Sequence, residues 1–146
     1  MNKPFCPMAT ACIHGGETAP DLRGRVSFYE LTNSVLVEVS IQGLPNSKTG
    51  FFGFHIHNGN SCSGADFSNT GSHYNPKDTR HPTHAGDLPP LLLCNGGANM
   101  TFVTDRFRIK DIIGKTVVIH DSPDDFTTQP AGNAGTKIGC GVIMKI

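Results

Sequence analysis

Two histidines stand two residues apart in the segment FFGFHIH, residues 51–57. The apolar residues at 52, 54 and 56 alternate with Gly53, His55 and His57, and this period of two is typical of a β-strand. Because side chains at i and i+2 of a strand project from the same face, His55 and His57 present two imidazole nitrogens to one ion. The segment therefore indicates a metal-binding face on a strand whose other face belongs to the core.

Further potential metal ligands follow this strand closely. Six of the seven histidines lie in the strand, in the polar stretch after it or at the end of a later strand: His55, His57, His73, His81, His84 and His120. Asp87 adds a carboxylate to the same polar stretch. An isolated HxH pair is more often an incidental polar face, but this concentration favours metal binding. A loop with few apolar residues is not ordered by burial, whereas a bound ion supplies ordering free energy.

The ligand types narrow the choice of metal to copper and zinc. Three histidines and an aspartate suit tetrahedral zinc, and a site made only of imidazoles can hold tetragonal Cu(II). Affinity order alone would fill every site with copper, so the geometry of the loop must discriminate. The sequence leaves open which metal enters which group.

Composition limits the other classes of function. Twelve Lys and Arg balance twelve Asp and Glu, so no basic field for nucleic acid and no polybasic membrane patch is expected. The start, MNKPFCPMAT, has no apolar run of signal-peptide or membrane-spanning length. As given, the chain is predicted to be cytoplasmic, or secreted or periplasmic if a leader was removed. Its length predicts one domain, residues 1–146.

The elements that must position the ligands are short strands. Seventeen Gly and ten Pro interrupt the chain too often for long helices, and every periodic stretch has a period of two. Strands are predicted within 9–15, 24–31, 34–45, 51–57, 99–107, 115–122 and 138–146, with one helical turn within 106–113 and nothing else helical. Two long polar loops, 58–90 and 121–137, remain. The pattern predicts an all-β antiparallel sandwich or barrel with two long functional loops.

Five cysteines, at 6, 12, 62, 94 and 140, include no CxxC pair. This spacing argues against a thiolate zinc site or a thioredoxin-like redox motif. An odd number of cysteines leaves at least one thiol unpaired, and the number alone does not identify which cysteines form a disulfide.

Five segments together resemble the copper,zinc superoxide dismutases, particularly the bacterial type. In chain order they are GFHIHNGNSC, GSHYNP, HAGDLPP, GKTVVIHDSPDD and NAGTKIGCGVI. The resemblance runs from Ala9 to Ile143 and is strongest from Gly53 onward. It implies a Greek-key, immunoglobulin-like β-sandwich of about eight strands, and an oxidoreductase that converts two superoxide anions to dioxygen and hydrogen peroxide. A homodimer is compatible with the family, although its members associate through different faces.

The resemblance also implies the role of each site residue. One copper per chain would be held by His55, His57, His73 and His120, and one zinc per chain by His73, His81, His84 and Asp87. His73 would be shared by the two ions and would take up and deliver a proton. Asp124 would accept hydrogen bonds from His55 and His81. Cys62 and Cys140 would form the disulfide, leaving Cys6, Cys12 and Cys94 as thiols.

One position departs from the family pattern. Lys137 stands where the family has an arginine beside the copper, and an ammonium is a compact, strongly hydrated point charge without the two directed donors of a guanidinium. Lys137 would attract superoxide but orient it less well. This departure favours an alternative function, a non-catalytic metal-binding or copper-handling protein on the same fold. A zinc-stabilised interaction module without copper would leave His55, His57 and His120 idle together.

Overall fold

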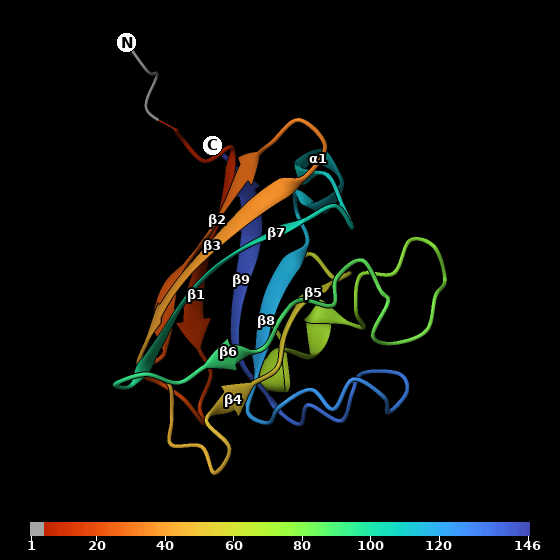
Figure 1. The fold of residues 1–146 in the computed structure, drawn as a ribbon. Coiled ribbons are helices and arrows are strands. Elements are labelled where there is room, and N and C mark those ends of the chain that lie inside the picture. The colour runs from red at the N-terminus through yellow and green to blue at the C-terminus, as the bar shows by residue number, and fades with distance from the viewer. Residues whose placement is uncertain (1–4) are drawn as a thin grey trace.

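A computed structural model describes residues 5–146 of the chain (Figure 1). The described part forms nine strands: β1 (Ala9–Gly15), β2 (Arg23–Glu30), β3 (Val35–Gln42), β4 (Phe51–Phe52), β5 (Phe54–His57), β6 (Leu91–Leu92), β7 (Gly97–Thr104), β8 (Thr116–His120) and β9 (Lys137–Lys145). Its two helical segments are the 3₁₀ helix η1 (Ala65–Thr70) and the single turn α1 (Ile109–Ile112). The helical turn predicted within 106–113 is α1. No helix among the described residues is long and apolar enough to cross a bilayer.

Seven of these strands form one antiparallel sheet in the order β5-β8-β9-β1-β2-β3-β7, and β4 pairs with β6 separately. The sheet curls so that β5, β8 and β9 lie across from β2, β3 and β7 (Figure 1). The chain leaves β3 for the opposite layer and returns to pair β7 with β3, which is a crossover of the Greek-key type. The predicted fold class, an all-β sandwich, is confirmed.

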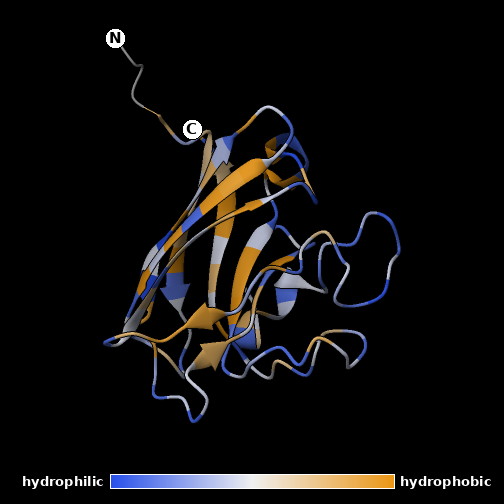
Figure 2. Ribbon diagram, in the orientation of Figure 1, coloured by the Kyte–Doolittle hydropathy of each residue, from blue (hydrophilic) through white to orange (hydrophobic). Residues whose placement is uncertain are grey.

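The core lies between the two layers and follows the period-two pattern. The alternate residues of β3 predicted to face inward, Val35, Val37, Val39 and Ile41, are all buried. Phe28 of β2 is fully buried and meets Phe107 edge to face, with ring centroids 6.4 Å apart. Figure 2 shows the hydrophobic residues concentrated on the strands and the hydrophilic ones in the loops. Burial of apolar surface therefore holds the strands in place.

The predicted strand 51–57 is divided at Gly53. The Gly53 N–H donates to Ser122 O and the Gly53 carbonyl accepts from His120 N–H, both at 2.8 Å. A Cβ at Gly53 would lie 2.8 Å from Ala134 Cβ, so only glycine lets the chain pass this close. β4 can then pair with β6 while β5 stays beside β8.

The sequence did not predict β6 or η1, and the expectation of no further helix was wrong at residues 65–70. Both elements are too short to show a period. One buried apolar side chain, Phe67, anchors η1, and its ring lies edge-on to His14 of β1 with centroids 5.7 Å apart. The first loop is thus held partly by burial of an apolar side chain, although its polar composition did not indicate this.

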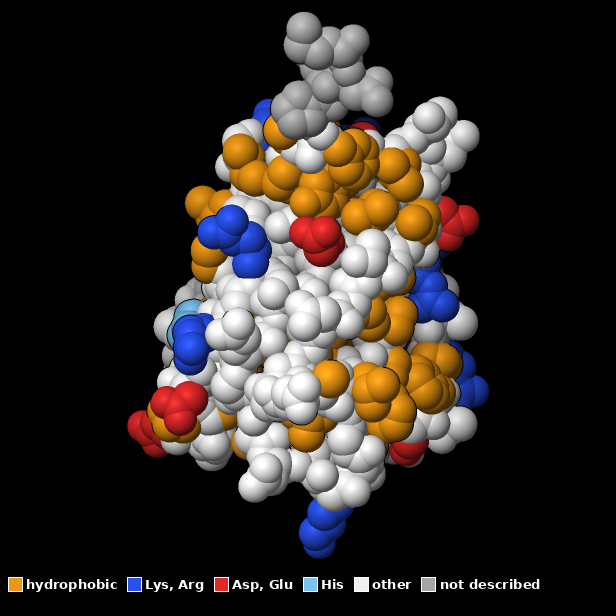
Figure 3. All heavy atoms as spheres, turned by 60° about the vertical axis from the view of Figure 1, so that its left-hand side comes forward, with side chains coloured by type: hydrophobic (Ala, Val, Ile, Leu, Met, Phe, Trp, Pro, Cys, Tyr) orange, Lys and Arg blue, Asp and Glu red, His pale blue; other side chains and the backbone are white. Residues whose placement is uncertain are grey.

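The end of the molecule where both described termini lie carries exposed apolar side chains, including Phe5, Met8, Met144 and Ile146. The backbone N–H of Ile146 donates to Met8 O at 3.0 Å, so the two chain ends lie side by side. Figure 3 shows apolar side chains gathered over this part of the surface. The described chain leaves this apolar surface uncovered.

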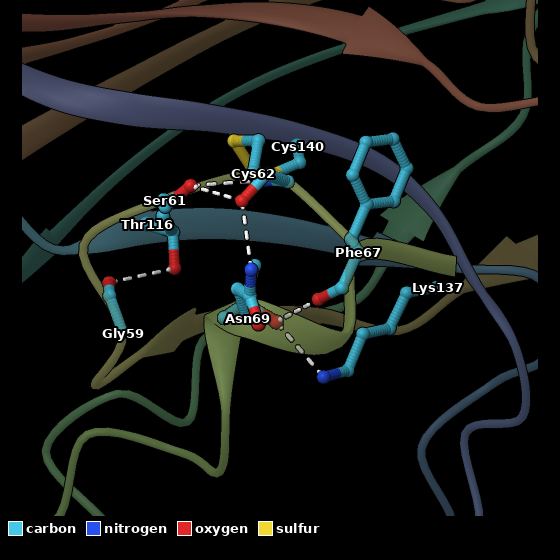
Figure 4. Close-up of a disulfide and its surroundings, with 10 residues drawn as sticks. Gly59, Ser61, Cys62, Phe67, Asn69, Thr116, Lys137 and Cys140 are labelled. Carbon is cyan, nitrogen blue, oxygen red and sulfur yellow. Dashed lines mark hydrogen bonds between the residues drawn. A yellow bond between two sulfur atoms is a disulfide. The ribbon is translucent and has the colours of Figure 1, made fainter. Parts of the chain in front are cut away.

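Cys62 and Cys140 form a disulfide that ties the first loop to β9 (Figure 4). The bridge spans a sequence separation of 78 residues, and in the loop-entropy model closing such a loop is worth ~4 kcal/mol. Cys6, Cys12 and Cys94 are exposed thiols. The disulfide therefore supplies part of the stability that η1 and the loop around it lack in apolar contacts.

We expect Cys62→Ser to lower the free energy of unfolding by about 2–4 kcal/mol, because the unfolded chain regains the freedom that the cross-link removes. Urea denaturation of the metal-free protein measures this change. Cys94→Ser is the matched control and should shift stability by less than about 0.5 kcal/mol, since it alters an exposed thiol. Equal stability of Cys62→Ser and the wild type would contradict the prediction.

Candidate metal centre

The outer faces of β5 and β8 form the floor of the site. Phe54 and Ile56 enter the core, so His55 and His57 project from the opposite face of β5. In the antiparallel register His55 pairs with Val118 and His57 with Thr116, and His120 ends β8. Both strands are buried along their whole length, because the two long loops cover this face.

The first loop reaches the floor by pairing with the free edge of β5. Ile56 N–H donates to Gly86 O and Tyr74 N–H donates to Ile56 O, both at 2.8 Å. A Cβ at Gly86 would overlap Ile56 O, so this approach requires glycine. The pairing seats His73 opposite His57 and Asp87 opposite His55 as isolated β-bridges. Backbone hydrogen bonds therefore place one histidine and one carboxylate of the loop beside the HxH pair.

The structure brings together all seven residues predicted as metal ligands, in two buried groups. In each group one possible ligand atom per residue lies within 4.8 Å of the others. The imidazole group is His55, His57, His73 and His120; the mixed group is His73, His81, His84 and Asp87. His73 belongs to both groups. Its Nδ1 lies 2.7 Å from Asp87 Oδ1, which leaves its Nε2 for the imidazole group.

Two rings of the imidazole group, those of His57 and His120, hold their protons on the sides away from each other. His57 Nδ1 donates to Gly71 O at 2.7 Å and His120 Nδ1 donates to Gly135 O at 3.3 Å. A carbonyl oxygen only accepts, so the other nitrogen of each neutral ring carries a lone pair. These two lone pairs, on His57 Nε2 and His120 Nε2, face each other at 3.2 Å. A cation between them would turn this repulsion into coordination.

Asp124 orients one ring of each group. Its Oδ2 accepts from His55 Nε2 and its Oδ1 accepts from His81 Nε2, both at 2.7 Å. His81 Nδ1 then lies 3.1 Å from Asp87 Oδ2 without forming a hydrogen bond to it, so its lone pair is free for a metal ion. Burial alone would raise the pKa of the Asp124 carboxyl, but the hydrogen bonds from His55 and His81 outweigh it and lower the pKa. Asp124 therefore stays a carboxylate and an acceptor.

Burial favours the neutral, metal-binding form of three of the imidazoles. Loss of water around the ring lowers the pKa of His55, lowers that of His57 well below its ordinary value, and lowers that of His120 to about 3. Burial would raise the pKa of Asp87, but the hydrogen bond with His73 outweighs it and lowers the pKa. Three buried nitrogens have no hydrogen-bond partner in the described chain: His55 Nδ1, His73 Nε2 and His81 Nδ1.

Orphaned buried polar atoms are rare in folded proteins and call for an explanation. Metal ions explain these three, because one ion in each group would accept the free lone pairs. Four imidazoles suit copper, and three imidazoles with one carboxylate suit zinc. The residues present therefore fit both ions that the resemblance implies.

Lys137 lies at the edge of the imidazole group. Its ammonium donates to Thr70 Oγ1 at 2.8 Å and to Gly71 O at 3.0 Å, and the same Gly71 carbonyl accepts from His57. Figure 4 shows the side chain reaching toward η1. Burial lowers the pKa of Lys137, and its charge helps to lower the pKa values of His57 and His120. Two of the three ammonium N–H groups are occupied, so one remains for a ligand.

Two other side chains, absent from the sequence prediction, hold the first loop from outside. Gln129 of the second loop accepts from His81 N–H at 2.9 Å and donates to His81 O at 2.7 Å. Arg106 donates to backbone carbonyls of the same loop. Both residues bind backbone atoms, which leave no signature in the residue types of the loop.

The fold and the two groups define a β-sandwich of the metal-binding class, and comparison with known proteins identifies its family. The copper/zinc superoxide dismutase (SODC) family model matches residues 22–143. Cu-Zn superoxide dismutase 2 of Aquifex aeolicus is 33% identical over 141 residues, covering 86% of this chain and 81% of that protein. The chain belongs to the copper/zinc superoxide dismutase family, which confirms the resemblance.

Proteins named only as similar to these enzymes also match. The superoxide dismutase-like protein YojM of Bacillus subtilis is 33% identical over 107 residues, covering 63% of this chain and 55% of YojM. A crystal structure of a double mutant of an SOD-like protein from Bacillus subtilis has a TM-score of 0.82 at 28% identity. It covers 92% of this chain and 96% of that one. The fold is thus common to proteins named as dismutases and to proteins named only as dismutase-like.

We expect Gly132→Ala to weaken zinc binding about 10- to 100-fold, because groups that orient metal ligands typically contribute this much. A Cβ at Gly132 would overlap Asp124 Oδ1 and lie 2.5 Å from His81 Nε2, forcing this hydrogen bond apart. Competition with a chromophoric chelator measures the affinity.

Gly50→Ala controls for backbone strain in this experiment. Its φ of +76° matches the +70° of Gly132, but its Cβ would meet no atom within 4 Å. If both variants bind zinc equally well, the contact with Asp124 and His81 has no role in binding.

Proposed function

We propose that the protein is a copper,zinc superoxide dismutase, which converts two superoxide anions and two protons into dioxygen and hydrogen peroxide. Family membership supports this activity. The observation that carries it is the position of His73, whose ring belongs to both ligand groups. An all-imidazole site that shares a ring with a His3Asp site has the donor sets for one redox-active ion and one redox-inert ion.

The imidazole group would hold copper and the mixed group zinc, one ion of each per chain. Copper, when bound, supplies the one-electron chemistry by cycling between Cu(II) and Cu(I). Zinc has no redox chemistry of its own, so its group supports the site structurally and electrostatically. Asp124 holds a ring of each group in the orientation that points its free nitrogen inward.

The chain's own residues would handle the proton and the anion. His73 can hold a proton at Nε2, which has no partner in the described chain, while its Nδ1 stays on the side of Asp87. Lys137 would attract superoxide with its charge and bind it through the one ammonium N–H that Thr70 and Gly71 leave free. The site would thus draw in a small anion and supply one proton to the product.

We expect His120→Ala to abolish superoxide removal, because it deletes one nitrogen of the imidazole group, and to reduce copper per chain with zinc retained. Metal analysis of the purified protein and a superoxide-removal assay measure the two effects. His14→Ala is the matched control, since His14 is exposed and lies outside both groups. Negligible activity of a wild type that carries both metals would contradict the proposed enzyme.

That result would favour the second candidate, a non-catalytic metal-binding or copper-handling protein. Lys137 supports this candidate, because an ammonium lacks the planar pair of donors that holds a small anion in one orientation. The similarity to dismutase-like proteins of Bacillus subtilis supports it as well.

We expect Lys137→Arg to maintain or raise the rate and Lys137→Ala to lower it about tenfold or more, because a nearby cation raises the encounter rate of an anionic substrate. The rate should also lose part of its dependence on ionic strength in Lys137→Ala. Kinetics at several salt concentrations test both effects, with Lys48→Ala, an exposed lysine of the loop before β4, as the control. An unchanged rate and salt dependence in Lys137→Ala would remove Lys137 from the site.

A further inference from the structure

Arg106 binds the backbone of the loop that carries the mixed group. It lies between β7 and α1, outside both ligand groups. Its Nη1 lies 2.9 Å from Pro82 O, 3.3 Å from His84 O and 3.1 Å from Asp87 O. One cation thus binds three carbonyl groups from a segment of six residues.

This convergence constrains two ligand residues directly. The carbonyls of His84 and Asp87 belong to members of the mixed group, and hydrogen bonds to a charged donor are stronger than those between neutral groups. Three carbonyl oxygens turned toward one point repel one another unless a donor lies among them. Without the guanidinium, the segment 82–87 would lose the donor that fixes the backbone of these two ligands.

The core holds Arg106 in place for this contact. The next residue, Phe107, is 4% exposed and packs edge to face against Phe28, and Arg106 N–H donates to Thr104 Oγ1 at 3.2 Å. Arg106 forms no ion pair with any described carboxylate, whereas Arg108 lies 3.8 Å from Glu30. The loop carbonyls are therefore the protein groups that its guanidinium binds.

We propose that Arg106 is a positioning residue for the zinc half of the centre, an inference that rests on the proposed assignment of zinc to the mixed group. It fixes the backbone of His84 and Asp87, so that their ligand atoms are already placed before the ion binds. Such preorganisation lowers the ordering cost of binding. The imidazole group receives His55, His57 and His120 from β5 and β8, so Arg106 acts on zinc much more than on copper.

The experiment measures zinc and copper affinities of the full-length metal-free protein by chelator competition. We expect Arg106→Ala to weaken zinc binding about tenfold, in the range typical of groups that support metal ligands, with copper affinity within about twofold of the wild type. Cobalt added in place of zinc should give an altered visible absorption spectrum in Arg106→Ala. Arg106→Lys keeps a cation with three donors and should recover part of the affinity.

Arg108→Ala is the matched control, since it removes the same charge two residues away without touching the loop. Zinc affinity of Arg106→Ala within twofold of Arg108→Ala would overturn the inference, and so would an equal loss of copper and zinc affinity. Absence of zinc binding by the wild type would overturn it as well. Superoxide removal does not enter this readout, so an inactive wild type that still shows the zinc-specific loss would contradict only the proposed enzyme.

If Arg106→Ala does not fold, hydrogen exchange of residues 82–87 in Arg106→Lys tests the inference instead. Protection equal to that of the wild type, together with unchanged zinc affinity, also overturns the inference.

Discussion

Lone pairs on buried nitrogens that face one another are unfavourable unless a cation lies between them. His57 Nε2 and His120 Nε2 are 3.2 Å apart, and the carbonyls of Gly71 and Gly135 hold the protons of both rings on the far side. His81 Nδ1 lies 3.1 Å from Asp87 Oδ2 and has no hydrogen-bond partner in the described chain. Burial lowers the pKa of His57 and of His120, so both rings stay neutral at neutral pH. Protonation therefore does not relieve the repulsion between their lone pairs. The protein therefore keeps two places where metal coordination relieves a cost that the fold imposes.

The rest of the architecture serves to maintain that arrangement. β5 and β8 bury apolar residues on one face and carry the histidines on the other, so the core stabilises the floor of the site. The first loop above this floor is held by the disulfide of Cys62, by Phe67 in η1, and by backbone pairing to β5. Asp124 joins the groups through one carboxylate. A change at Asp124 would thus reach both ligand groups, although they share only the ring of His73.

Much of this could be predicted from the sequence because it depends on period and residue type. Alternation placed His55 and His57 on one face, and the polar loop with its histidines indicated a second ligand group. Contacts to backbone atoms could not be predicted in the same way. The carbonyls of Gly71 and Gly135 are backbone groups, and a backbone carbonyl accepts hydrogen bonds whatever the residue type. The positions of Arg106 and Gln129 depend on where two loops meet. The pairing of β4 with β6 involves two residues on each side, too few for any period.

Lys137 shows how such a backbone contact bears on function. An ammonium is a flexible point charge, but here Thr70 Oγ1 and Gly71 O hold it by two of its three donors. These contacts restrict the free N–H to a narrow range of directions, which restores part of the orientation that a planar guanidinium would provide. The Gly71 carbonyl also fixes the ring of His57, so the cation and one ring of the imidazole group share an anchor. A lysine held in this way can combine attraction for a small anion with a defined place beside the imidazole group. Lysine in place of arginine at this position is therefore weaker support for a non-catalytic protein.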